Sequence, residues 1–156
     1  MPFSAVSISS TGGASAYDVF SIKASPVGRV EISSIKLGQQ SSAPASNQQL
    51  SIQVFTGSTA LGGGGATITP VNLKRWNGAP TAGSSATAPS SNLASTSSAT
   101  LLFADASDVS GAWSFKPDEF SEIILEAGQA LNVRVSAPPA TALLSGSLVF
   151  KELTKP

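Results

Sequence analysis

The sequence contains no histidine and no cysteine, and these two absences remove much of the usual catalytic and metal-binding chemistry. Without histidine there is no Ser-His or Cys-His nucleophile, no imidazole metal ligand and no general base that titrates near neutral pH. Without cysteine, disulfide bonds and thiol chemistry are excluded. We therefore expect a protein that is not an enzyme and that uses no metal ion or cofactor.

Charged residues are also scarce. They make up 12% of the chain, about half the usual share, and nine acidic residues balance nine basic ones. A neutral chain has no basic field that attracts nucleic acid or an anionic membrane. Low charge leaves a free monomer weakly protected against unspecific association. A protein that is packed against its partners does not need this protection. A soluble domain kept in solution by its Ser, Thr, Asn and Gln residues is the open alternative.

Long apolar runs are missing too. No segment approaches the roughly 18 apolar residues of a membrane-spanning helix. Residues Met1–Ser4 lack a charged region followed by an apolar stretch, so we expect no signal peptide and a soluble protein made in the cytoplasm. A chain of 156 residues is the size of one domain, here residues 1–156, and is long enough to bury a sizeable core.

The sequence is instead rich in short β-type segments separated by Gly, Pro and Ser. Leu50, Ile52 and Val54 alternate with polar residues, as in a half-buried strand, and so do Leu131, Val133 and Val135. In the segment 28–37 the apolar phase slips at Ser33 and Ser34, which indicates a β-bulge. The predicted strands are 15–24, 28–37, 50–54, 66–76, 99–104, 112–115, 120–125, 130–136 and 144–150.

About eight or nine short strands with regularly spaced turns predict an antiparallel all-β domain: a sandwich, a jelly roll or a barrel. Pro70 confines its strand to an edge or marks a break, and Gly62–Gly65 is typical of a flexible hairpin tip. Residues 117–126 have a helix as the alternative to a strand. The Ser/Ala/Gly/Pro-rich loop at about 77–98 is either disordered or ordered against a neighbouring subunit.

A few groups of neighbouring residues could bind a metal ion or a ligand, or act in catalysis. Asp105 and Asp108 have a spacing that suits Ca²⁺ in a loop, but we favour a solvated turn that is capped by these side chains. The acidic residues Asp118, Glu119, Glu122 and Glu126 are not expected to converge as a catalytic carboxylate pair. Lys74, Arg75 and Trp76 together could stack on a base or a sugar, but one such cluster in a neutral protein is a weak signal.

Several segments resemble a group of small proteins encoded near the capsid genes of tailed phages. The resemblance covers most of the chain, and each motif is built from common strand and turn residues. The matching segments are Thr69–Leu73, Ser110–Trp113, Phe115–Pro117, Glu122–Gln129, Leu131–Pro138 and Gly146–Glu152, with a short opening strand from Phe3 to Ser9. The chain departs from the pattern in its longer loop at 77–98 and in Gly62–Gly65.

The resemblance implies a jelly-roll-like sandwich that decorates the outer surface of a phage head. Its partners would be the major capsid protein and two further copies of itself in a homotrimer, and its location would be the virion. From residue type alone, Trp76, Leu93 and Trp113 are the candidate protein contacts. A tail, baseplate or fibre component and a carbohydrate-binding module stay open as alternatives, the latter with few aromatic residues for a binding platform.

Overall fold

The computed structural model describes residues 3–11, 15–40, 49–73, 84–87, 94–95, 97–108, 111–118, 121–136 and 143–154. These residues contain strands and no helix, so no described segment is a helix that could cross a membrane. The strands are β1 (Phe3–Thr11), β2 (Tyr17–Lys23), β3 (Gly28–Gln39), β4 (Gln49–Ser58), β5 (Thr67–Ile68), β6 (Val71–Asn72), β7 (Ser85–Thr87), β8 (Thr100–Asp108), β9 (Trp113–Phe115), β10 (Ile123–Leu125), β11 (Ala130–Val135) and β12 (Leu144–Thr154).

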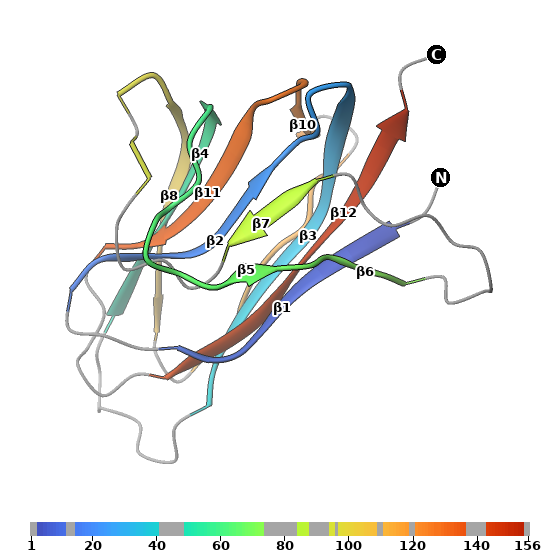
Figure 1. Ribbon diagram of the computed structural model, residues 1–156. Helices are drawn as coiled ribbons and strands as arrows, with labels where there is room; N and C mark the ends of the chain where they lie inside the picture. Colours follow the sequence, from blue (N-terminus) through green and yellow to red (C-terminus); the bar gives the residue numbers. More distant parts are fainter. Residues whose placement is uncertain are drawn as a thin grey trace.

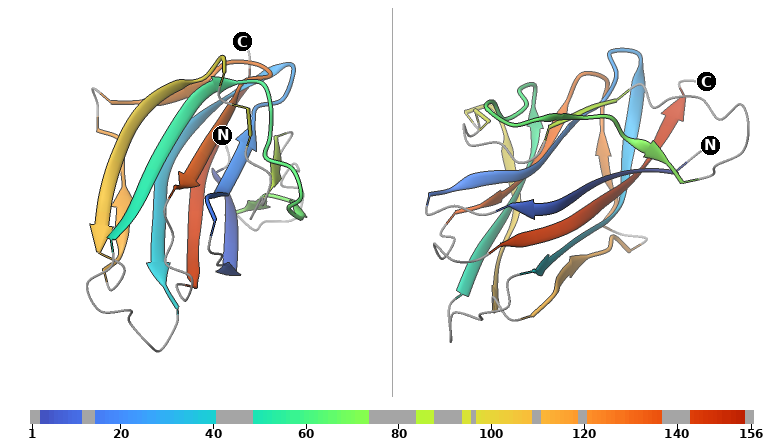
Figure 2. Two further views of the ribbon diagram at one scale, coloured as in Figure 1. Left: turned by 90° about the vertical axis from the view of Figure 1, so that its left-hand side faces the viewer. Right: turned by 60° about the horizontal axis from the view of Figure 1, so that its bottom comes forward.

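The strands form two antiparallel sheets packed face to face, which confirms the predicted all-β sandwich (Figures 1 and 2). Sheet A has the order β10-β3-β12-β1-β6, and β9 also pairs with β3. Sheet B has the order β5-β7-β2-β11-β4-β8. Beyond the nine predicted ranges the structure adds β1, which the resemblance alone implied, and the short β7, and it divides the predicted strand 66–76 into β5 and β6.

The pairing pattern is that of a jelly roll. The first four long strands pair with the last ones in reverse order: β1 with β12, β2 with β11, β3 with β10 and β9, and β4 with β8. The long strands therefore follow the path of one long hairpin rolled into two sheets, and residues 59–99, here called the insertion, connect β4 to β8 along the chain.

The core lies between the sheets and is made by the alternating apolar positions. On β3, Val30 and Ile32 are buried, and after the slip Ile35 and Leu37 are buried as well. The predicted bulge is confirmed, because the pairing with β12 shifts between Val149 and Phe150 at this point. Each large aliphatic side chain removed from water contributes roughly 1.5–3 kcal/mol, so this interior holds the two sheets together.

Strand β11 departs from the half-buried pattern that its alternation predicts. All six of its residues are buried, including Asn132 and Arg134 on the polar face. Parts of the insertion cover that face. The alternation of apolar and polar residues along β11 cannot reveal this coverage, because the insertion is distant in the sequence. Both faces of the middle of sheet B are therefore buried.

The structure agrees with one of three local predictions and differs from the other two. Pro70 marks a break, because β5 before it joins sheet B and β6 after it joins sheet A. Gly62–Gly65 is not a hairpin tip, since β4 ends at Ser58 and does not pair with β5. The helical alternative at 117–126 is wrong for the described part, where Ile123–Leu125 pairs with β3 and buries alternate residues.

Candidate protein-contact site

Of the three predicted contact residues, only Trp113 falls within the described residues; Trp76 and Leu93 lie outside them. Trp113 begins β9 and pairs with Leu37 at the edge of sheet A. Its side chain is half-buried and packs against the core. It is therefore neither a fully exposed contact nor a fully buried core residue.

Trp113 belongs to an aromatic cluster that joins the two sheets along one side. Phe103 of β8 lies 4.7 Å from Phe115 and 6.2 Å from Trp113, measured between ring centroids. The Trp113 Nε1–H donates a hydrogen bond of 3.1 Å to the Asp105 carboxylate, again on β8. Tilted ring pairs of this kind add to the area they bury. We call Phe103, Trp113 and Phe115 the aromatic seam.

The position of Asp105 corrects the two readings of Asp105 and Asp108 as loop or turn residues. Strand β8 continues to Asp108, four residues beyond the predicted end at Ala104, so both aspartates lie on a strand and pair with β4. Within the described part of the chain, no group of three or more acidic side chains is placed to hold a metal ion. A calcium loop is therefore not formed at these residues.

Strand β8 is the outermost strand of sheet B, and it is exposed on both faces. Only Phe103 and Ser107 are partly buried, and the other side chains of the strand are exposed. Leu101 is 47% exposed and Leu102 is 40% exposed. This exposure could not be predicted from the sequence, because the apolar run Leu101-Leu102-Phe103 is equally typical of a buried strand.

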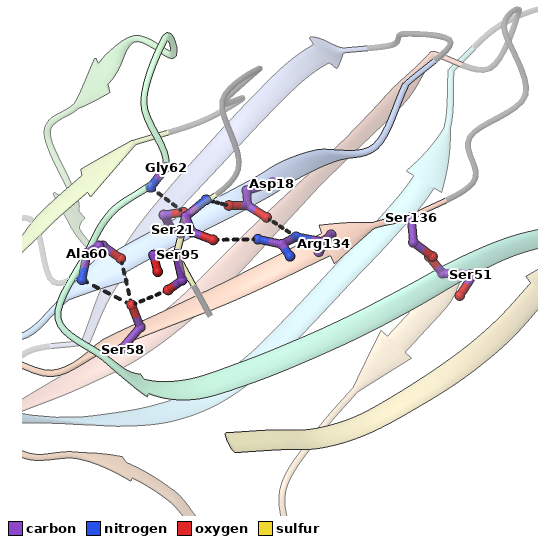
Figure 3. A network of polar contacts seen from close by, with 10 residues as sticks. Asp18, Ser21, Ser51, Ser58, Ala60, Gly62, Ser95, Arg134 and Ser136 are labelled. Atoms are coloured by element: carbon purple, nitrogen blue, oxygen red, sulfur yellow. Dashed lines mark hydrogen bonds and ion pairs between the residues drawn. The ribbon is translucent and has the colours of Figure 1, made fainter. Parts of the chain in front are cut away.

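The insertion is held onto sheet B by a buried ion pair (Figure 3). The Arg134 Nε–H donates to the Asp18 carboxylate over 2.8 Å, and both side chains are nearly or fully buried. The second carboxylate oxygen of Asp18 accepts the backbone N–H of Ala94 at 2.7 Å, and Arg134 donates to the Ala94 carbonyl oxygen at 2.9 Å. We call Asp18, Arg134 and the Ala94 backbone the clamp.

Further hydrogen bonds fix both ends of the insertion to the same sheet. Ser58 Oγ accepts the N–H of Ala60 at 3.0 Å and donates to the carbonyl oxygen of Ser95 at 3.1 Å (Figure 3). The Gly62 N–H donates to Ser21 Oγ on β2 at 3.3 Å. The described parts of the insertion therefore dock on the sandwich of their own chain. The signal that could have revealed this is a pair of opposite charges inside two apolar strands.

A second surface feature is an open groove on the outer face of sheet A, with a volume of about 720 Å³. It is lined by Phe3, Glu31, Ile32, Ser33, Lys116, Pro117, Asp118 and Glu122. Lys151 donates to Glu31 over 3.4 Å beside it. Two of the acidic residues expected to diverge, Asp118 and Glu122, thus share one groove.

The remaining acidic residues of that stretch do not join them. Glu126 accepts from Arg29 over 2.7 Å in an exposed ion pair, and Glu119 lies outside the described residues. The groove is open and has no buried carboxylate pair of the kind that acid–base catalysis at a glycosidic bond needs.

Comparison with protein-family models, with curated proteins and with solved structures found no match to this chain.

Proposed function

We propose that the chain is a structural virion protein that decorates the outer surface of a phage head. In this function it binds the major capsid protein as a homotrimer and stabilises the contacts between neighbouring capsid subunits. The proposal extends the likeness of the sequence segments to small proteins encoded near phage capsid genes. Jelly rolls occur in viral capsid proteins and also in lectins, so the fold alone does not decide between functions.

The observation that carries the proposal is the apolar surface borne on rigid strands. Large apolar side chains are exposed at strand edges and ends: Phe3, Val71, Leu73, Leu101, Leu102, Ile124 and Leu143. Leu101 and Leu102 are adjacent on β8, and neighbouring exposed apolar side chains are typical of protein contact surfaces. Strands that are fixed in a sandwich present such side chains with little loss of conformational freedom on binding.

Low charge and many identical copies fit the same function. Each chain on a shell makes modest contacts, and the simultaneous engagement of many contacts produces a large total stabilisation. A shell also supplies the packed surroundings that a weakly charged protein needs to avoid unspecific association.

Native mass measured by light scattering over a range of protein concentrations tests the oligomer. A mass of three chains that does not change with concentration is expected. A monomer at all concentrations would remove the trimer from the proposal.

Co-sedimentation with purified heads of the virus that encodes the chain tests the location. Saturable binding to heads, and none to purified tails, is expected. Binding to tails alone would contradict head decoration and favour a tail or baseplate component.

A further inference from the structure

The side-chain amide of Asn132 is buried and lacks hydrogen bonds. Asn132 lies in the middle of β11 and is 0% exposed. Its Nδ2 donor and its Oδ1 acceptor both have no hydrogen-bond partner in the described part of the chain. Buried polar atoms of native proteins are nearly always paired, either with other protein atoms or with ordered water. The amide therefore needs a partner that both accepts and donates.

The neighbours of Asn132 belong to the polar face of sheet B. Across the ladders, Asn132 pairs with Ser21 of β2 and with Phe55 of β4, and Arg134 follows on the same side of β11. Ser21 Oγ accepts the N–H of Gly62, and the Arg134 guanidinium lies 5.1 Å from the centroid of the Phe55 ring. Figure 3 shows Ser21, Arg134 and Gly62 in this arrangement. Asn132 thus lies on the face that the insertion covers.

The described residues by which the insertion is bound to this face are small. Gly62 donates its backbone N–H to Ser21, and the Ala94 backbone takes part in the clamp. The carbonyl oxygen of Ser95 accepts from Ser58. None of these groups bonds to the amide of Asn132. A cover of small residues can enclose a water molecule that a large side chain would displace.

Tyr17 provides a contrast, because its hydroxyl is also buried without a partner among the described groups. Tyr17 belongs to the apolar core between the sheets. An internal water molecule typically forms about three hydrogen bonds, so it needs several polar groups within reach. Asn132 supplies a donor and an acceptor and has Ser21 beside it, whereas Tyr17 supplies a single hydroxyl among apolar side chains. Internal water is therefore favoured at Asn132 and not at Tyr17.

We propose that Asn132 binds internal water between sheet B and the insertion. The water accepts a hydrogen bond from Nδ2 and donates one to Oδ1, so both buried groups are satisfied. A metal ion does not fit, because it would bind Oδ1 and leave Nδ2 without an acceptor. The bound water lies beside the clamp and adds to the polar contacts that hold the insertion. This site does not depend on the proposed function.

The test measures magnetisation transfer between solvent water and the Nδ2 protons of Asn132 in the full chain, by NMR. Cross-peaks in the laboratory frame and in the rotating frame have opposite signs for a long-lived water and the same sign for bulk water. We expect opposite signs at Asn132. The control is the amide of Gln53, which lies one strand away and is partly exposed, so that the same sign is expected.

The decisive variant is Asn132→Leu, which replaces the amide by an apolar side chain of similar size. Deuteron relaxation dispersion of the solvent reports long-lived water, and its amplitude should fall in Asn132→Leu and stay unchanged in the matched control Gln53→Leu. An unchanged amplitude in Asn132→Leu would overturn the proposal, and so would cross-peaks of the same sign at Asn132 in the wild type. If Asn132→Leu does not fold, the signs measured in the wild type decide.

Discussion

At the scale of single residues, Asp18 and Arg134 carry charge into a buried part of sheet B. Each also binds the backbone of Ala94, so removing either side chain leaves the other charge and a backbone group without a partner. Breaking a buried ion pair from one side costs about 3–5 kcal/mol. We expect Asp18→Ala to lower the free energy of unfolding by about that amount in urea denaturation.

The control for this loss is Lys151→Ala. Lys151 pairs with Glu31, but both side chains are about a third exposed, at 31% and 28%. Solvent-accessible pairs contribute about 0–1 kcal/mol. Equal losses in Asp18→Ala and Lys151→Ala would contradict the clamp.

The burial of Tyr17 leads to a prediction about how stability depends on pH. Its hydroxyl is buried without a hydrogen-bond partner among the described groups, and burial raises its pKa from 10.0 to about 12. Because the folded pKa is the higher one, the stabilisation is complete below pH 10.0 and is lost as the pH rises towards about 12. The loss is at most about 1.4 kcal/mol for each unit of pH.

The measurement is simple because Tyr17 is the single tyrosine of the chain. Phenolate absorbance should appear well above pH 10.0 in the folded protein and at its ordinary pKa in urea. Tyr17→Phe should be at least as stable at neutral pH, since no hydrogen bond is lost. A phenolate that forms near pH 10.0 in the native protein would show that the ring is accessible.

At the scale of elements, β12 and β3 approach closely at Gly146. A Cβ atom there would collide with the carbonyl oxygen of Lys36 and lie 2.9 Å from Leu37 Cδ2. Gly146→Ala should therefore lower the free energy of unfolding by roughly 1–3 kcal/mol. Gly38→Ala on β3 is the control, because a Cβ there meets nothing within 4 Å and should change stability by less than about 0.5 kcal/mol. Similar thermal unfolding of both variants would contradict this close approach.

The elements that the sequence predicted well are those whose pattern is local. The bulge at Ser33 and Ser34 and the break at Pro70 follow from residue chemistry alone. β2, β3 and β9 also lie close to their predicted ranges.

The parts that could not be predicted depend on partners far away in the sequence. The burial of Asn132 and Arg134 requires the insertion, and the exposure of Leu101 requires that no described strand covers β8. The aromatic seam joins β8 and β9 from different sheets, so the residue type of Trp113 could not reveal its packing partners. Alternation reports which residues are apolar, and only the topology decides what covers them.

At the scale of the whole molecule, the rolled hairpin requires contacts between the two ends of the chain. Phe3 pairs with Lys151, and Tyr17 pairs with Val135. Such distant pairs form only after large loops have closed, and domains of this kind fold in milliseconds to seconds. Stopped-flow refolding followed by tryptophan fluorescence should show this range. Refolding within microseconds would mean that local contacts dominate.

The clamp also has an evolutionary consequence. The insertion is bound by one acidic and one basic residue of sheet B, Asp18 and Arg134. We therefore expect the insertion and these two residues to be gained or lost together in evolution. Relatives with a short connection between β4 and β8 should carry neither charge at positions 18 and 134, and relatives with the long connection should retain both. The two positions would then vary as a pair, although they lie 116 residues apart.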